Sequence, residues 1–178
     1  MNAQFTPLRE PVNLGDLLKY EEGRLNYSRE QVTVASGQNL ELGAVVGRVT
    51  ATGKLKRFDP VATDGTEDVA GILLGAVDAT LIQRDDALLL ARHAIVASNA
   101  VVWPVGITTE QKAAAIAALE ARGITVLIKG VQARHESLFR TVGVLGALRH
   151  HHHLYNDLPT AIAHARDHVR REQSAPTP

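Results

Sequence analysis

The sequence predicts a β-rich α+β domain. Short β-branched and apolar runs, cut at close intervals by Gly, Asp-Pro and Asp-Gly, fill residues 42–78, and this alternation is typical of a compact β-meander. Further apolar runs of strand length follow between residues 87 and 103. One segment, residues 108–123, has the start and stop signals of a helix. Many short strands and one clear helix therefore indicate the β-rich class.

The strands are expected from the first alternating run onward. Val32 and Val34 alternate with polar residues before a turn at Ser36 and Gly37, which predicts a first core strand and its hairpin. The later expected strands are a run around Val45, Val46 and Val49, a half-buried strand at 55–58, a fully buried strand at 69–74, strands at 87–91, 94–97 and 100–103, and a last strand at 124–128.

The expected helix begins after Thr108. Thr108 and Gln111 have the spacing of a capping box, and Gly123 suits the position just after a helix. Ile116 and Leu119 mark its buried face, so both are predicted to pack in the core.

The single tryptophan, Trp103, is also assigned to the core. It precedes Pro104, and a lone Trp in such a place is more often a packing residue than a ligand platform. We therefore expect it to be buried at the end of a strand.

The composition is that of a globular chain of 178 residues, with 45% hydrophobic and 21% charged residues. Lys plus Arg equals Asp plus Glu at 19 each, so no net field draws in nucleic acid or an anionic membrane. Polar residues interrupt the longest apolar region, residues 87–107, which argues against a membrane span. The first residues lack the basic start and apolar region of a secretion signal. Cysteine is absent, which excludes disulfides and thiolate chemistry and fits a reducing cytosol.

No motif predicts catalysis, a cofactor or a metal. His150 to His153 are adjacent, and adjacent imidazoles cannot all face one ion in a regular element. Asp85 and Asp86 are expected in a turn before a strand, and residues 43–47 lack the Gly-Lys-Ser/Thr of a phosphate loop. A metal-dependent hydrolase would need a general base and ligand spacing that the sequence does not provide. We therefore expect a protein that is not an enzyme.

Residues 1–25 are predicted to form an N-terminal arm. The segment holds two early prolines and a short apolar patch, and such a segment adds little core but offers backbone and apolar contacts to a partner. The patch residues, which we expect to bind the partner, are Leu14, Leu17 and Leu18.

Residues 129–178 are predicted to form a helical C-terminal extension. Apolar residues recur at helical spacing on both sides of the histidine run, which indicates two amphipathic helices with the histidines in the loop between them. The apolar positions are Val131, Leu138, Phe139, Val142 and Leu145, then Leu158, Ile162, Ala165 and Val169.

Residues 28–128 resemble the lambda-type phage head decoration proteins. The likeness is carried in order by SREQVTV, GQNLELGAVVGRVTATGKLKRFDP, DGTEDVAGILLGAVDAT, AVVWP and TTEQKAAAIAALEARGITV. The resemblance implies a β-clip-like body at residues 26–128 that assembles as a homotrimer. It also implies that the trimer binds the major capsid protein of the expanded head, through an arm that orders on the shell, and braces the shell against internal DNA pressure. Such a protein is part of the virion and is made in the cytoplasm of the bacterial host.

The C-terminal extension, with EARGITVLIKG before it, is similar to the closing half of a STAS domain. The alternative function is therefore a STAS-type regulatory module, or a chimera containing its C-terminal half, that binds a partner protein or nucleotide. The Asp-x-Ser loop of a full STAS domain is not found upstream. A trimer that adds to phage shells would support the first hypothesis, and a monomer that binds nucleotide would support the second.

Overall fold

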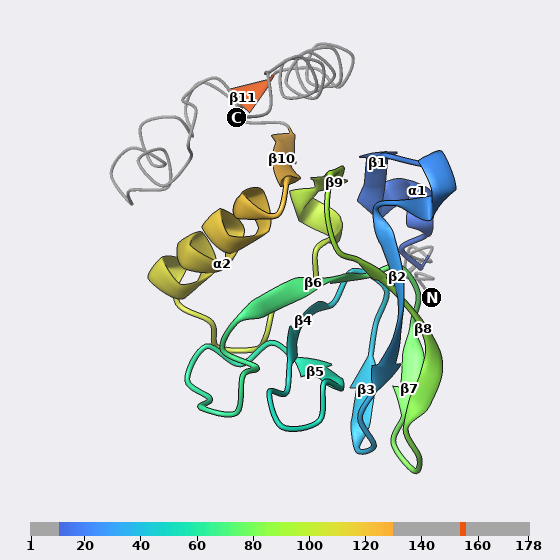
Figure 1. The fold of residues 1–178 in the computed structure, drawn as a ribbon. Coiled ribbons are helices and arrows are strands. Elements are labelled where there is room, and N and C mark those ends of the chain that lie inside the picture. Colours follow the sequence, from blue (N-terminus) through green and yellow to red (C-terminus); the bar gives the residue numbers. More distant parts are fainter. Residues whose placement is uncertain (1–10, 130–153, 156–178) are drawn as a thin grey trace, which may run out of the picture.

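A computed structural model describes residues 11–129 and 154–155 of the chain. In this part the chain forms a closed five-stranded barrel, a four-stranded sheet, a two-stranded ribbon and one long helix (Figure 1). The prediction of a β-rich α+β fold is confirmed. The elements are α1 (Leu14–Leu17), β1 (Leu18–Glu21), η1 (Arg24–Asn26), β2 (Arg29–Val34), β3 (Gln38–Leu40), β4 (Val45–Arg48), β5 (Leu55–Arg57), β6 (Val69–Leu73), β7 (Val77–Ala79), β8 (Arg84–Leu90), β9 (Ala94–Ala97), η2 (Ser98–Ala100), α2 (Thr109–Ala121), β10 (Ile124–Lys129) and β11 (Leu154–Tyr155).

The barrel strands are buried on both faces. Neighbours along a strand point to opposite sides, so Val46 and Leu89 join the cluster inside the barrel, while Val45 and Leu90 join a second cluster outside it. The outer cluster also contains residues of α2, β9 and β10. This double coverage explains why every residue of β6 is buried, as the sequence predicts for that run.

The strand pairing differs from the predicted meander. The barrel order is β2-β5-β4-β6-β8, so β5 and β6 flank β4 instead of pairing with each other. The hairpin predicted at Ser36 and Gly37 is wrong, because β3 pairs with β7 while β2 pairs with β8 and, in parallel, with β5. Closing the barrel gives both edges of β2 a hydrogen-bonded partner strand. β2 therefore pairs with β5 and β8 instead of with β3.

The first described residues belong to the body. Asn13 caps α1 reciprocally with Asp16, and β1 pairs antiparallel with β9. Leu17 is fully buried in the outer cluster. Gly43, at a φ of +86°, passes so close to the Ala100 carbonyl beside Leu17 that a Cβ would clash. The predicted arm boundary at residue 25 therefore falls inside the folded body, which begins with α1.

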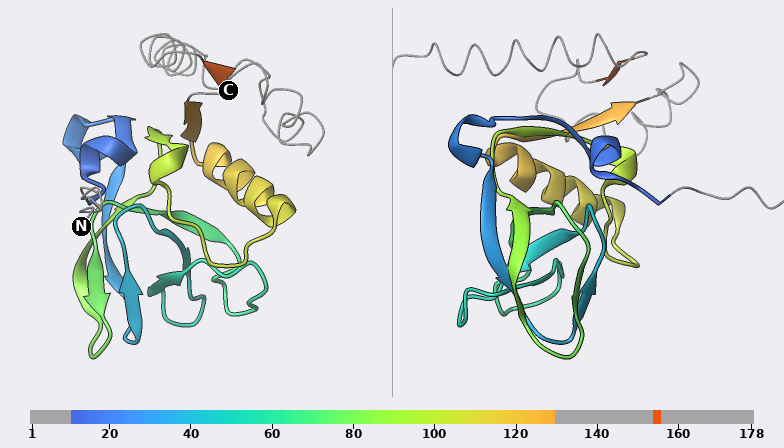
Figure 2. Two further views of the ribbon diagram at one scale, coloured as in Figure 1. Left: turned by 180° about the vertical axis from the view of Figure 1, so that it is seen from behind. Right: turned by 90° about the vertical axis from the view of Figure 1, so that its right-hand side faces the viewer.

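Helix α2 lies between the β1-β9-β10 sheet and the end of the barrel (Figure 2). Its capping box is formed as predicted, and Gly123 follows it at a φ of +75°. Ala115 and Leu119 are buried, and Ile116 packs on the same cluster at partial burial. After Gly123 the chain enters β10, which runs parallel to β9.

A further prediction concerns the acidic pair of residues 85 and 86. Asp85 and Asp86 lie within β8 and not in a turn before it, because β8 extends back to Arg84 opposite Val34 of β2.

The helices and histidine run predicted for the C-terminal extension lie outside the described residues. Of that extension, Leu154 and Tyr155 form β11 in parallel with the end of β10. In the described part, no helix is long and apolar enough to cross a membrane.

Candidate interaction surfaces

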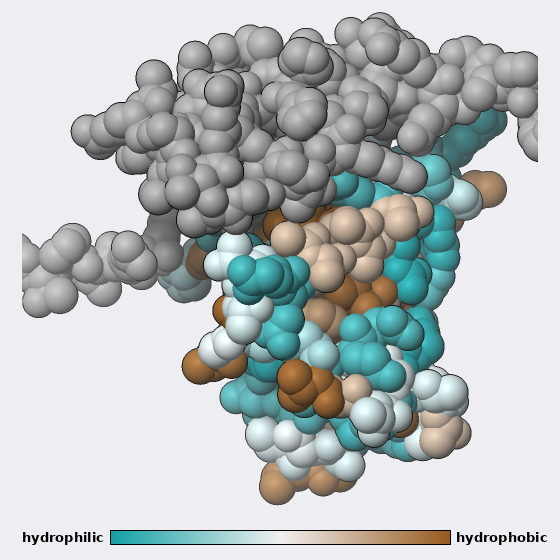
Figure 3. All heavy atoms as spheres, turned by 90° about the vertical axis from the view of Figure 1, so that its left-hand side faces the viewer, coloured by the Kyte–Doolittle hydropathy of each residue, from teal (hydrophilic) through white to brown (hydrophobic). Residues whose placement is uncertain are grey.

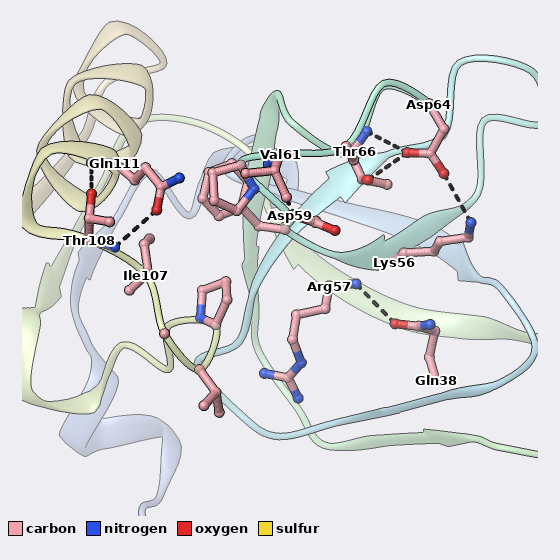
Figure 4. Close-up of a pocket in the computed structure, with 16 residues that line it drawn as sticks. Gln38, Lys56, Arg57, Asp59, Val61, Asp64, Thr66, Ile107, Thr108 and Gln111 are labelled. Carbon is pink, nitrogen blue, oxygen red and sulfur yellow. Dashed lines mark hydrogen bonds and ion pairs between the residues drawn. The ribbon is translucent and has the colours of Figure 1, made fainter.

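A groove of about 670 Å³ lies between two loops below α2 (Figure 4). One wall is the loop that follows β5, the other is the loop that leads into α2, and β5 and the start of β3 contribute the floor. The lining residues are Gln38, Lys56, Arg57, Phe58, Asp59, Pro60, Val61, Ala62, Asp64, Thr66, Pro104, Val105, Gly106, Ile107, Thr108 and Gln111.

The first wall is held by carboxylates that accept hydrogen bonds from their own loop. Asp59 Oδ1 accepts from the Val61 N–H at 3.1 Å. Asp64 Oδ1 accepts from the Thr66 hydroxyl at 2.5 Å and from the Thr66 N–H at 3.1 Å, and Asp64 Oδ2 pairs with Lys56 Nζ at 3.0 Å. These hydrogen bonds lower the pKa of Asp64 to about 2. The hydrogen bond from the Thr66 hydroxyl contributes most, and the one from Lys56 is next. The loop is therefore a fixed wall.

Gly65 lets this wall lie against the barrel. It has a φ of +100°, and an added Cβ would clash with Thr50 and with the Arg48 carbonyl. Only glycine combines that backbone conformation with so close an approach.

The second wall ends in the α2 capping box. The Thr108 N–H donates to Gln111 Oε1 at 2.9 Å, and the Gln111 N–H donates to Thr108 Oγ1 at 3.2 Å. Behind this wall Trp103 packs on the outer core cluster, and Lys112 Nζ lies 5.3 Å from the centre of its ring. The helix start and the tryptophan thus fix both ends of the loop.

Arg57 occupies the floor. Its backbone N–H donates to Gln38 Oε1 at 3.0 Å, and its Nη2 donates to the Asn39 carbonyl at 3.2 Å and to Glu41 Oε2 at 2.7 Å. The hydrogen bond from Arg57 lowers the pKa of Glu41. In Figure 4 the Arg57 side chain extends from β5 alongside the loop that leads into α2, and its guanidinium is held there by Asn39 and Glu41.

The rims of the groove are apolar and exposed. Val61 is 75% exposed on one wall and Val105 fully exposed on the other. Hydrophobic side chains stand out among hydrophilic ones on this side of the molecule (Figure 3). A second exposed pair, Leu81 at 91% and Ile82 at 68%, lies in the loop between β7 and β8. Val61 and Val105 lie on the two walls of the groove, and Leu81 and Ile82 are neighbours in the chain, so each pair is a small exposed apolar feature.

A third surface lies where η1 meets the turn between β8 and β9. Leu25 is 97% exposed, and Leu25, Asn26 and His93 all have positive φ. Arg92 holds this corner together, because its guanidinium donates to the Tyr27 carbonyl at 2.6 Å, pairs with Glu30 and lies over the Tyr27 ring. The corner is a rigid projection beside β1.

The site residues predicted from sequence are placed as follows. Leu17 is buried, and Leu14 and Leu18 pack at partial burial on the same cluster. Leu119 is buried, while Ile116 and Trp103 are partly buried against that cluster. Trp103 follows an isolated bridge between Ala44 and Val102 and does not end a regular strand.

The groove was missed by sequence reasoning. Val61 and Val105 each follow a proline, Pro60 and Pro104, and both prolines indicate only a break in a strand. No local pattern shows that two such loops, far apart in the chain, face each other.

The fold and these surfaces define the molecule as a small β-barrel protein whose surface carries a groove and exposed aliphatic side chains. Among the described residues, no group of three or more His, Cys, Asp and Glu side chains could hold a metal ion.

Comparison with protein families identifies the family. Residues 7–124 match the family described as bacteriophage lambda head decoration protein D. The chain belongs to this family, which confirms the predicted relationship. It is a phage head decoration protein, a structural component of the virion capsid. A search of curated proteins finds no match. The family match ends at the first residue of β10, and the STAS resemblance of the extension beyond it stays a prediction.

Proposed function

We propose that the protein binds the expanded phage head as a homotrimer, contacts the major capsid protein and stabilises the shell against internal DNA pressure. The observation that carries this proposal is the extent of the family match. It runs from residue 7 to residue 124, and so includes the whole barrel, α2 and residues 7–13 of the segment before α1. The barrel, α2 and the second half of the N-terminal segment are therefore family features.

We propose that the shell contact lies mainly in residues 1–13. Leu17 has no exposed surface in this fold, whereas Val12 is 50% exposed. Leu14 and Leu18 are only partly buried, so they remain candidates for a contact that continues from the arm onto the body. An extended segment can add backbone hydrogen bonds and apolar side chains to a shell protein.

This role uses rigidity and not catalysis, so we propose no enzymatic activity. The barrel is closed, so its strands pair on both sides, and closure of this kind removes free edges. A body with paired strands and a double core can transmit load between the surfaces that it contacts.

The test uses full-length protein and expanded heads that lack decoration protein. We expect the protein to sediment with the heads to a saturating occupancy and to raise the temperature at which packaged heads release DNA. Saturating occupancy without any gain in head stability would contradict the stabilising role. Failure to bind, together with a monomer that binds nucleotide, would favour the STAS-type alternative.

A further inference from the structure

The sheet that contains β1, β9 and β10 has two faces, and α2 covers one of them (Figure 2). Val96 of β9 and Val126 of β10 are opposite each other in the register, and both join the outer core cluster with residues of α2. Successive residues of a strand point to opposite faces of a sheet. Ile95 and Leu127 therefore point to the second face, which is turned away from α2 and the barrel.

This second face is apolar and buried. Ile95, Ala97 and Leu127 are 2%, 7% and 5% exposed. Among residues 11–129 and 154–155, the hydrophobic side chain that packs against Ile95 and Leu127 is that of Tyr20 in β1, which is itself partly buried. A fully buried side chain usually touches about six or more residues. One tyrosine does not provide those contacts, so a further apolar segment lies over the face.

The strand order indicates which segment this is. Strand β11 returns to the sheet and pairs in parallel with the end of β10, on the side opposite β9. The two parallel connections, β9 to β10 and β10 to β11, thus advance in the same direction. Such crossovers are right-handed, and two that advance in one direction lie on the same face of the sheet. The first contains α2, so residues 130–153 are directed to the α2 face, and the segment after β11 is left for the second face.

We propose that residues 157–170 form a helix that docks on the second face of this sheet and covers Tyr20, Ile95 and Leu127. Asp157 suits an N-cap and Pro159 the first turn. The apolar residues that follow have the spacing of a single helical stripe. They are Leu158, Ile162, Ala165 and Val169.

The proposed helix also fits the sheet in length. A stripe from residue 158 to residue 169 is about 16 Å long, and four strands spaced about 4.8 Å apart span about 14 Å. The family match ends at residue 124, so the proposed cover lies beyond the part that the chain shares with the family. The docking depends on neither head binding nor trimer formation.

The first test is a disulfide within one chain, which the absence of native cysteine makes specific. Thr125 lies on the same face as Leu127 and is partly exposed, so the full chain with Thr125→Cys and Ile162→Cys places both thiols at the proposed contact. We expect oxidation to produce a faster-moving monomer band on a non-reducing denaturing gel. The matched control carries Thr125→Cys and His164→Cys, and it should stay unlinked because residue 164 is on the opposite side of the helix.

The alternatives give different products in the same experiment. A disulfide between two chains would assign the face to a second copy and overturn the proposal. Equal linking of the control, or an unlinked Thr125→Cys and Ile162→Cys pair, would overturn it as well.

The second test measures the cover through the labelling rate of Leu127→Cys by a maleimide. We expect Ile162→Asp to raise this rate about tenfold or more, the factor that corresponds to a loss of about 1.4 kcal/mol of docking free energy. His164→Asp should not raise it. Val96→Cys reports on the opposite face, and its continued protection would separate undocking from unfolding. Equal rates with Ile162→Asp and His164→Asp would mean that another segment, such as residues 1–10, covers the face, and would overturn the proposal.

Discussion

Asp64 shows how one side chain fixes a wall of the groove. Its carboxylate accepts from Thr66 and pairs with Lys56, and these contacts lower its pKa from 3.8 to about 2. A carboxyl whose pKa is lower in the folded protein stabilises the fold above its ordinary pKa. That contribution is lost as the pH falls from about 4 towards about 2.

We therefore predict that Asp64→Ala lowers the midpoint of thermal unfolding at neutral pH, and that its difference from wild type shrinks through this pH window. The effect should be modest because the side chain is largely exposed and water screens its ion pair. Thermal melts at a series of pH values provide the check. A difference that does not change between neutral pH and the acid end of the window would contradict this account.

Trp103 is a packing residue with an unused donor. Its ring lies against the outer core cluster, and its buried Nε1 donates to no described residue. We predict that Trp103→Ala costs about 3 kcal/mol, near the lower end for large aromatic truncations, because the ring is only partly buried. Trp103→Phe should cost clearly less, since it keeps ring contacts and removes a buried donor without an acceptor. Equal losses for the two variants in denaturant unfolding would show that the indole N–H matters more than packing.

The elements with local signals were predictable from the sequence. Helix α2 follows from the Thr108–Gln111 box and Gly123, because capping and termination act within a few residues. Strand β6 follows from an unbroken apolar run. The pairing of β2 with β8 could not be predicted, because the turn at Gly37 has the local signal of a hairpin while barrel closure depends on residues far away in the chain. The groove escaped prediction for the same reason.

The folded body begins within the N-terminal segment, at Asn13. Residues from Asn13 onward cap and form α1, bury Leu17 and lead into β1, which pairs with β9. Pro11 and Val12 precede the cap and are exposed. The sequence pattern alone placed the boundary at residue 25, because the apolar spacing of Leu14, Leu17 and Leu18 suits a partner's surface as well as the chain's own core.

We predict that deleting residues 1–12 leaves thermal unfolding unchanged and abolishes binding to heads, since the Asn13 cap and the buried Leu17 are retained. Deleting residues 1–21 should destabilise the fold, because removal of a buried leucine side chain alone costs about 2 to 5 kcal/mol and β9 also loses a partner. Leu17→Ala is the matched control, and it should weaken the fold and keep binding. Unchanged binding after the shorter deletion would show that the arm is not the anchor.

At the scale of the whole molecule, the fold brings rigid surfaces to different sides of one small body. The groove below α2 and the β7–β8 loop lie at one end of the body, and α1, which follows the segment that we propose for the shell contact, lies at the other (Figure 1). Of the C-terminal extension, Leu154 and Tyr155 pair with the end of β10. The sequence resemblance indicated the family and the β-rich class, but the surfaces required the tertiary structure, since each combines residues from separate loops.

The central claim is that the protein binds the phage head as a homotrimer. The most direct measurement is an electron cryomicroscopy reconstruction of expanded heads saturated with the full-length protein. We predict density for three barrels around each threefold and quasi-threefold position, with the N-terminal segment on the shell. Single barrels at unrelated positions, or heads without added density at saturating protein, would contradict the account.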